Sequence, residues 1–250
     1  TFKDIKKEYE QIDVLLTGYS GAGPYPQCFE NLNISEKIIA ANKKEKQFLD
    51  QAINYINDIK PKFYFPFAGT YTLTGKLSKF QDLRGVSNID NAFNFFENYY
   101  NEKNLSNVIK PLKLSAGNTF DLSLGEYDNN YKKINYNEYQ SYIDKELSHR
   151  YFDYENDEPS SFDEIYELSK KAHKRFLDKL HNNNVILKTD IFLKINGKSL
   201  KLGQNKSLSV IKTNEIDHIS KKYVSYETDI RLLKRLLMGP KYAHFNIATC

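Results

Sequence analysis

Two loops that combine glycines with hydroxyl side chains are the parts of this sequence best suited to bind a ligand. Residues 18–24 read Gly-Tyr-Ser-Gly-Ala-Gly-Pro, and residues 67–71 read Phe-Ala-Gly-Thr-Tyr. Glycines let backbone amides approach a ligand closely, and the hydroxyls can form hydrogen bonds to it. The candidate substrate-binding residues are Tyr19, Ser20, Gly21, Thr70 and Tyr71. The alternative is that both loops are only tight turns, because Gly and Pro mark turns.

Neither loop matches a standard catalytic motif. Residues 18–22 lack the Gly-Lys-Ser/Thr ending of a phosphate-binding P-loop, and the next predicted helix begins too late to follow one. As a nucleophile elbow, Gly18-x-Ser20-x-Ala22 is degenerate, and no helix follows it directly. We therefore exclude a P-loop and do not favour a serine hydrolase.

The histidines and cysteines do not have the spacing of metal ligands. No pair of histidines forms H-x-H or H-E-x-x-H, and the two cysteines lie far apart, without a metal-binding partner spacing. The residues concerned are His149, His173, His181, His218, His244, Cys28 and Cys250. We predict no complete metal site in this chain, and we expect the histidines to be exposed or hydrogen-bonded.

The two loops are predicted to meet at one edge of a parallel sheet. Residues 11–17 and 62–67 are short apolar runs typical of buried strands. Between them, apolar residues recur at helical spacing over residues 34–59, and Lys60-Pro61 ends this helix. Strand, helix and strand form a βαβ unit with parallel strands and a right-handed crossover. Ligands bind at the carboxyl ends of such strands, where both loops lie.

The rest of the chain is predicted to change from α/β to α+β character. We expect helices at residues 91–100, 138–147, 161–180 and 228–238, and strands at 107–114, 119–124, 185–195, 207–213 and 221–226. Asn196-Gly197 indicates a β-hairpin. Three regions follow: an α/β half-domain at residues 1–125, a helical segment at 126–184, and a small α+β region at 185–250.

Composition excludes several classes of protein. Of 250 residues, 40% are hydrophobic and 14% aromatic, which is unlike a disordered chain. No stretch approaches the roughly 18 apolar residues that a membrane helix needs. Lys and Arg number 36 and Asp and Glu 32, giving a net charge of +4, and the charges are interspersed, so nucleic acid is not favoured as a partner. Two distant cysteines without a signal sequence favour a cytoplasmic location.

The ends of the sequence suggest a piece of a longer protein. The chain begins at Thr1, its single methionine is Met238, and residues 245–250 form no polar tail. We expect a fragment of a larger protein.

Two segments resemble proteins of the metallo-β-lactamase fold. Residues 13–29 (Asp-Val-Leu-Leu-Thr-Gly-Tyr-Ser-Gly-Ala-Gly-Pro-Tyr-Pro-Gln-Cys-Phe) are followed by a lysine-rich helix and by residues 60–69 (Lys-Pro-Lys-Phe-Tyr-Phe-Pro-Phe-Ala-Gly). This order is similar to that of the metallo-β-lactamase-like part of CMP-N-acetylneuraminate hydroxylase and its bacterial relatives. Residues 229–239 and 242–246 resemble the C-terminal region of that group. The resemblance covers about residues 10–85 and 215–250.

The resemblance implies the C-terminal half of an αββα sandwich, followed by a smaller α+β region. The family's main metal-ligand motif, H-x-H-x-D-H, is absent from this chain, and Ala68 and Gly69 stand where many members place a final histidine ligand. A divalent metal, zinc or iron, is therefore expected for the parent protein only. The C-terminal segment would add His244 and Asn246 to the substrate-binding residues. Hydroxylation is not expected, because the paired Cys and His ligands of a Rieske cluster are missing.

The preferred hypothesis is part of a metal-dependent hydrolase that acts on a small ester or phosphoester. The alternatives are a non-catalytic ligand-binding module of the sterol-carrier type and an accessory module of a sugar-nucleotide pathway. The leucines at residues 232, 233, 236 and 237 could line a lipid cavity, although such a stripe is usually core. Nucleic-acid binding through Lys170-Lys171, Lys174-Arg175 and Lys221-Lys222 is less favoured, because runs of charge are usually solvated helix faces.

Overall fold

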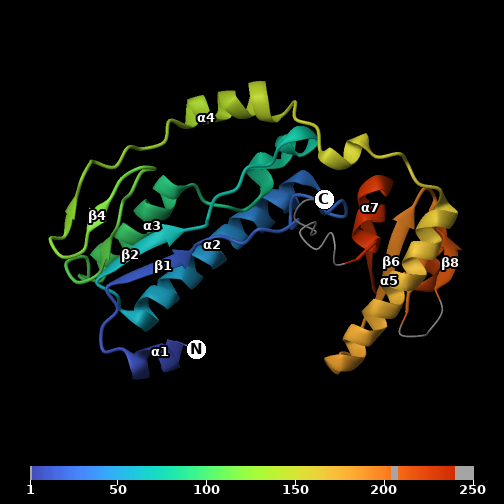
Figure 1. Ribbon diagram of the computed structural model, residues 1–250, viewed down its shortest axis with the longest axis horizontal. Helices are drawn as coiled ribbons and strands as arrows, with labels where there is room; N and C mark the ends of the chain where they lie inside the picture. Colours follow the sequence, from blue (N-terminus) through green and yellow to red (C-terminus); the bar gives the residue numbers. More distant parts are fainter. Residues whose placement is uncertain (1, 204–207, 240–250) are drawn as a thin grey trace. The chain divides into compact units, whose positions relative to one another are not determined.

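The described part of the chain contains three β-sheets, and the two larger ones each pack against their own helices (Figure 1). The computed structural model describes residues 2–203 and 208–239. Contacts divide the chain into unit 1, Thr1–Arg150, and unit 2, Tyr151–Cys250. The class is α+β, as expected. The division falls inside the predicted helical segment 126–184, so that α4 (Tyr136–Tyr142) belongs to unit 1 and α5 (Phe162–Asn182) to unit 2.

The predicted βαβ unit is confirmed in unit 1. Strand β1 (Val14–Gly18) pairs in parallel with β2 (Phe63–Phe67), and α2 (Ile34–Ile59) connects them. The register joins Val14 to Phe63 and Gly18 to Phe67, so the two strands end side by side. Asn33 caps α2 through a capping box with Glu36. The helix ends at Lys60, in a left-handed conformation, directly before Pro61.

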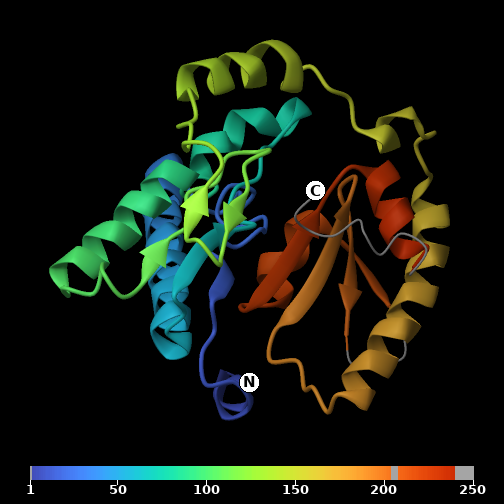
Figure 2. The ribbon, with the colours of Figure 1, turned by 60° about the vertical axis from the view of Figure 1, so that its left-hand side comes forward.

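A third strand and a second helix extend the unit in the same direction. Helix α3 (Ile89–Glu102) leads to β3 (Lys110–Pro111), which pairs in parallel with β2 to give the order β1-β2-β3. Figure 2 shows α2 and α3 on one side of this sheet. Their apolar faces pack on it in one core cluster, made of Tyr19, Leu49, Ala52, Ile53, Ile56, Tyr64, Ala92, Phe96, Tyr100 and Ile109.

Three local expectations in unit 1 were wrong. The predicted strands at 107–114 and 119–124 are reduced to β3 and to β4 (Phe120–Asp121), which pairs with β5 (Glu126–Tyr127). The Asp121 carboxylate accepts hydrogen bonds from the Ser123 and Leu124 amides and so fixes that hairpin. The apolar stripe of residues 34–59 predicts that Ile38 faces inward, but Ile38 is exposed, whereas Lys37 is buried on α2. The helix expected at 138–147 is α4 continued by the π-turn η2 (Ile143–Leu147), and α1 (Phe2–Glu8) and the 3-10 segment η1 (Gly75–Leu83) were not predicted.

Unit 2 contains a four-stranded mixed sheet. The strands are β6 (Asp190–Ile195), β7 (Lys198–Leu202), β8 (Ser209–Lys212) and β9 (Tyr223–Glu227), in the order β8-β7-β6-β9. Strands β6 and β7 form the hairpin expected at Asn196-Gly197, both of which have positive φ. Strand β9 runs parallel to β6. Short helical turns lie at η3 (Asp153–Asn156), η4 (Thr213–Glu215) and α6 (Ile216–Ile219).

Helices α5 and α7 (Ile230–Leu237) form the core of unit 2 with this sheet. Ile165 from α5 and Leu233 and Leu237 from α7 pack against Ile195 and Leu200. The predicted α5 is confirmed, with Ser161 as its N-cap. Two details differ from the sequence expectation. Strand β6 begins at Asp190 because residues 185–189 are exposed coil, and Leu236 is only half-buried, whereas Leu232 is buried.

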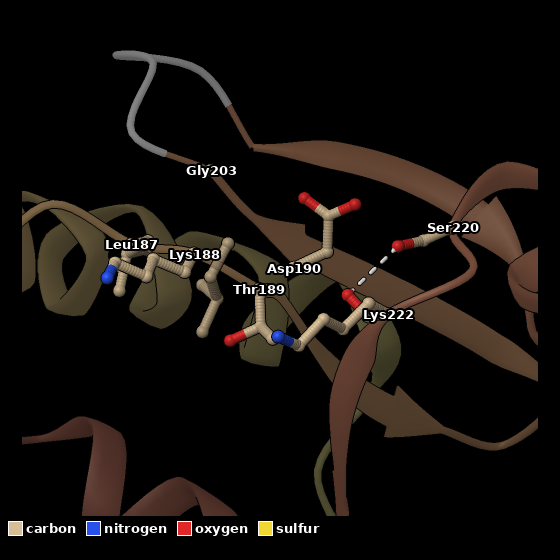
Figure 3. A pocket seen from close by; sticks show the side chains of 8 residues that line it. Leu187, Lys188, Thr189, Asp190, Gly203, Ser220 and Lys222 are labelled. Atoms are coloured by element: carbon tan, nitrogen blue, oxygen red, sulfur yellow. Dashed lines mark hydrogen bonds between the residues drawn. The ribbon is translucent and has the colours of Figure 1, made fainter.

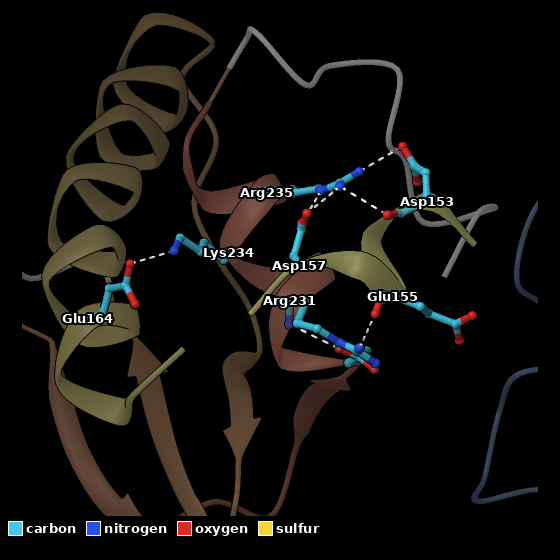
Figure 4. Close-up of polar contacts among 8 residues, drawn as sticks. Asp153, Glu155, Asp157, Glu164, Arg231, Lys234 and Arg235 are labelled. Atoms are coloured by element: carbon cyan, nitrogen blue, oxygen red, sulfur yellow. Dashed lines mark hydrogen bonds and ion pairs between the residues drawn. The ribbon is translucent and has the colours of Figure 1, made fainter. Parts of the chain in front are cut away.

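Three basic residues of α7 attach this helix to neighbouring segments of unit 2 (Figure 4). The Arg235 guanidinium contacts the carboxylates of Asp157 at 2.5 Å and Asp153 at 2.8 Å. Lys234 pairs with Glu164 on α5 at 2.7 Å, and Arg231 donates to the Glu155 carbonyl at 2.6 Å. Only 15% of the Arg235 side chain is exposed, so this pair is less screened by solvent than a typical surface pair.

We expect Arg235→Met to lower the thermal midpoint of unit 2 by roughly 2–8 °C at neutral pH, because the variant keeps the apolar stem but loses the ion pairs. The Arg235 guanidinium holds the pKa of Asp157 below its usual range. A depressed carboxylate pKa adds stability above about pH 4 and loses it as the pH falls further. The difference between variant and wild type should therefore shrink towards pH 2 in thermal melts. Lys170→Met, which removes an exposed pair with Glu167, is the control; an equal shift in both variants would contradict the expectation.

Candidate functional site

The two predicted loops form bends at residues 18–24 and 67–71, and these two bends lie side by side at the carboxyl ends of β1 and β2. The Tyr19 hydroxyl and the Thr70 Oγ1 are 2.9 Å apart, and the Ser20 hydroxyl donates a hydrogen bond to the Gly69 carbonyl. Thr70 also donates to the Ser87 carbonyl at 3.3 Å. The parallel register therefore brings the bends together as the sequence predicted, and side-chain hydrogen bonds hold them there.

Close packing explains two of the glycines in these bends. A Cβ at Gly69 would lie 2.0 Å from the ring of Tyr19, which is only 2% exposed. A Cβ at Gly21 would lie 2.2 Å from the ring of Phe48 on α2. Gly23 has no neighbouring atom within 4 Å of such a Cβ. Gly69 and Gly21 are thus required by packing inside the bends, and no ligand is needed to explain them.

The predicted substrate-binding residues fall into two groups. The hydroxyls of Tyr19, Ser20 and Thr70 are engaged in joining the bends. Tyr71 differs, because its buried hydroxyl does not bond the other loop. It lies near Gln27 and the Gly23 backbone without a hydrogen bond of normal geometry, and the Arg84 guanidinium lies 5.3 Å from the centre of its ring. The two C-terminal candidates, His244 and Asn246, lie outside the described residues.

A carboxylate and three tyrosines lie next to the bends. The Tyr131 hydroxyl donates to Asp90 at 2.8 Å. Burial raises the pKa of Tyr136 to about 12, with a contribution from Asp90, and burial also raises the pKa of Tyr19. All three phenols therefore stay protonated near neutral pH and act as hydrogen-bonding groups. None of them is suited to serve as a base there.

Sequence reasoning missed a group of basic residues that contacts the segment just after the first loop and, through Arg84, the Tyr71 ring of the second loop. Lys44 on α2 donates to the carbonyls of Tyr25 and Arg84, each at 2.8 Å. Lys37, seven residues earlier on the same helix, donates to the Gln27 carbonyl at 3.2 Å. Arg84 donates from Nε to the Gln81 carbonyl at 2.5 Å. The seven-residue spacing of the lysines on a predicted helix was the available signal, since it places both on one face.

The opposite face of the parallel sheet is apolar and partly bare. Leu15 and Tyr64 face the helices, so the alternation of side chains turns Leu16, Phe65 and Phe67 to the other side. Leu16 is 55% exposed and Phe67 is 51% exposed. Near the start of β2, Phe63 packs against Phe120 of the β4–β5 hairpin, with ring centres 5.0 Å apart. The hairpin thus covers one end of this face and leaves the end nearest the bends open.

Among the described residues, no group of three or more His, Cys, Asp or Glu side chains could hold a metal ion. His173 is buried and bonds the Gly203 carbonyl at 2.7 Å, while the other three described histidines are exposed. The histidines in the described ranges thus have the structural environments that the sequence suggested.

A polar pocket lies in unit 2, where β6 begins and β7 ends (Figure 3). Its lining includes Lys188, Asp190, Ser220 and Lys222. These polar groups largely bond one another or nearby strands: Asp190 pairs with Lys201 at 2.9 Å, and Ser220 donates to the Lys222 carbonyl at 3.3 Å. The Lys201 ammonium lowers the pKa of Asp190, which therefore stays ionised as its partner. The arrangement fixes the ends of the strands.

Comparison with known proteins gives no relative of this chain. No family model matches it, and neither the curated proteins nor the solved structures contain a match. In the part of the chain that is described, no helix has the length and apolar character needed to cross a membrane.

We expect Gly69→Ala to destabilise unit 1 by about 1–3 kcal/mol, because the added methyl group overlaps the buried Tyr19 ring. Gly23→Ala, in the partner bend, is the matched control and should change stability by less than about 0.5 kcal/mol. Urea unfolding monitored by circular dichroism measures both. Equal stability of the two variants would show that the bends do not pack as described.

Proposed function

We propose that this chain is part of a metal-dependent hydrolase of the metallo-β-lactamase superfamily, acting on a small ester or phosphoester in the cytoplasm. In this proposal, unit 1 is one half of an αββα sandwich, and its two bends form the substrate side of the active site. The support is the sequence resemblance together with one structural observation, the bare apolar face of the parallel sheet.

The bare face carries the proposal because parallel sheets are normally covered on both sides. Helices α2 and α3 cover one side of β1-β2-β3, and the hairpin β4–β5 covers only the end near Phe63. Leu16 in the middle of β1 and Phe67 at the end of β2 are left about half exposed. A second β-sheet packed on this face would complete the core. It would lie beside the edge of the first sheet where β1 and β2 end and the bends begin.

The position of the bends supports the proposal that substrate binds at the carboxyl ends of β1 and β2. Tyr19, Ser20 and Thr70 fix the two bends to each other, so the residues that follow them are held in a defined place. Tyr71 follows directly and presents its ring to Arg84. In this view Tyr71 binds substrate, whereas Tyr19 and Ser20 act as positioning residues.

The side chains of the described residues do not fit a divalent metal, because no suitable cluster of ligands is present among them. The zinc or iron that the resemblance implies would need ligands from outside these residues. We therefore assign no catalytic step to a metal in this chain. Its residues bind and orient the substrate.

The ligand-carrier alternative receives less support from unit 2. Leu232, Leu233 and Leu237 are buried, and the latter two pack against Ile165, Ile195 and Leu200. The pocket found in this unit is polar and open. A lipid carrier needs an enclosed apolar cavity instead. Two of the basic residues of α5 also have local partners, Glu167 for Lys170 and the Leu237 carbonyl for Arg175, which weakens the nucleic-acid alternative.

Metal analysis tests the hydrolase directly. The protein expressed from its complete reading frame should contain a stoichiometric divalent metal and should hydrolyse small esters or phosphoesters. Chelation should remove both the metal and the activity, and zinc or iron should restore them. A metal-free preparation with full activity would overturn the proposal.

Substitutions on the two faces of β1 test the second sheet. In the product of the complete reading frame, Leu16→Ala should cost about 2–5 kcal/mol because a covering sheet buries Leu16. In residues 1–250 alone it should cost less than about 0.5 kcal/mol, because Leu16 is exposed. Leu15→Ala, on the helix-covered face, is the control and should destabilise both forms. A Leu16→Ala variant that is neutral in both forms would rule out the sheet.

A further inference from the structure

Two cations of unit 1, Lys44 and Arg84, lie next to each other, and the exposed carboxylate of Asp82 acts on Arg84. Lys44 bonds the carbonyl oxygen of Arg84, and the Arg84 guanidinium stacks near the ring of Tyr71. The hydrogen bonds given by the Lys44 ammonium and by the Arg84 Nε go to backbone carbonyls and not to carboxylates. Burial lowers the pKa of Lys44, and the positive charge of Arg84 adds to this effect. Two partly buried like charges are unfavourable unless a counterion offsets them.

The hydrogen-bonding capacity of this pair is also incomplete. The Arg84 Nη1 atom is buried and has no hydrogen-bond partner among the described residues, and the buried Tyr71 hydroxyl lies near Gln27 and the Gly23 backbone without a hydrogen bond of normal geometry. Buried polar groups in folded proteins nearly always have one. The other side of the guanidinium is fixed, because Nε donates to the Gln81 carbonyl at 2.5 Å. The unused donors therefore belong to one rigidly held group of side chains.

The backbone around Arg84 is positioned by a close contact with α2. Gly85 has φ of +62°, and a Cβ there would lie 2.6 Å from the Ala41 carbonyl oxygen. Only glycine fits this approach. One turn along the same helix, Lys44 reaches both the Tyr25 and the Arg84 carbonyls. The Arg84 guanidinium and the Tyr71 hydroxyl are thus held in place beside the two bends.

We propose that Arg84, Lys44 and Tyr71 bind a phosphate group of a small-molecule ligand. Two positive charges match a phosphate dianion, and a guanidinium with a phenol hydroxyl supplies the donors that phosphate oxygens accept. This deepens the proposed function by naming the substrate class as a phosphate-bearing molecule. The statement that the ligand is a substrate rests on the proposed function, whereas the statement that the site binds phosphate does not.

Binding of inorganic phosphate to residues 1–250 tests the site without turnover. Isothermal titration calorimetry or ³¹P relaxation should show saturable binding that weakens as sodium chloride is raised. Arg84→Gln should weaken the affinity about tenfold or more, and Tyr71→Phe, which keeps the ring beside the guanidinium, should weaken it by a smaller factor. Acetate in place of phosphate distinguishes a carboxylate site, which would overturn the choice of phosphate if acetate bound more tightly.

Lys46→Gln is the matched control, because Lys46 lies on the same helix but pairs with Asp50 on an exposed face. Its phosphate affinity should equal that of the wild type. Failure of the wild type to bind phosphate, or equal binding by Arg84→Gln, would overturn the site. If Arg84→Gln does not fold, the comparison of Tyr71→Phe with Lys46→Gln decides. Because no step uses metal or hydrolysis, phosphate binding by a protein without hydrolase activity would reject the proposed function and keep this site.

Discussion

Parallel pairing of β1 with β2 is the constraint on which the rest of unit 1 depends. A parallel pair needs a long crossover, and the 26-residue α2 supplies it. Because both strands then end at the same edge, the bends after Gly18 and Phe67 must be neighbours. Tyr19 and Ser20 use this proximity to join the bends through Thr70 and Gly69. The continuation to β3 in the same direction leaves the far face of the sheet without helices.

The features predictable from sequence are those with a strong local period or a distinct turn signal. Helix α2 has the predicted bounds because Asn33 and Pro61 delimit an amphipathic run. The Asn196-Gly197 hairpin follows from residues that tolerate positive φ. The short β3 and β4 were overestimated, because an apolar run cannot show how many of its residues find a ladder partner.

The site was only partly predictable for a similar reason. The bends could be placed from their glycines, but the roles of their hydroxyls depend on contacts between residues about 50 positions apart. Arg84 was missed because it follows a 3-10 segment that has no sequence period, and its partners Lys44 and Tyr71 come from other segments. Long-range pairing of this kind is set by the tertiary fold and is not encoded in any local pattern.

Helix α2 is much longer than the strands it covers, so its two halves have different contacts. At 1.5 Å per residue the helix spans about 39 Å, whereas a five-residue strand spans about 17 Å. The C-terminal half, including Leu49 and Ile56, belongs to the core, while Lys37, Ala41 and Lys44 in the N-terminal half support the loops. Residues in the half of the helix that contacts the loops can therefore change without disturbing the half that packs on the sheet.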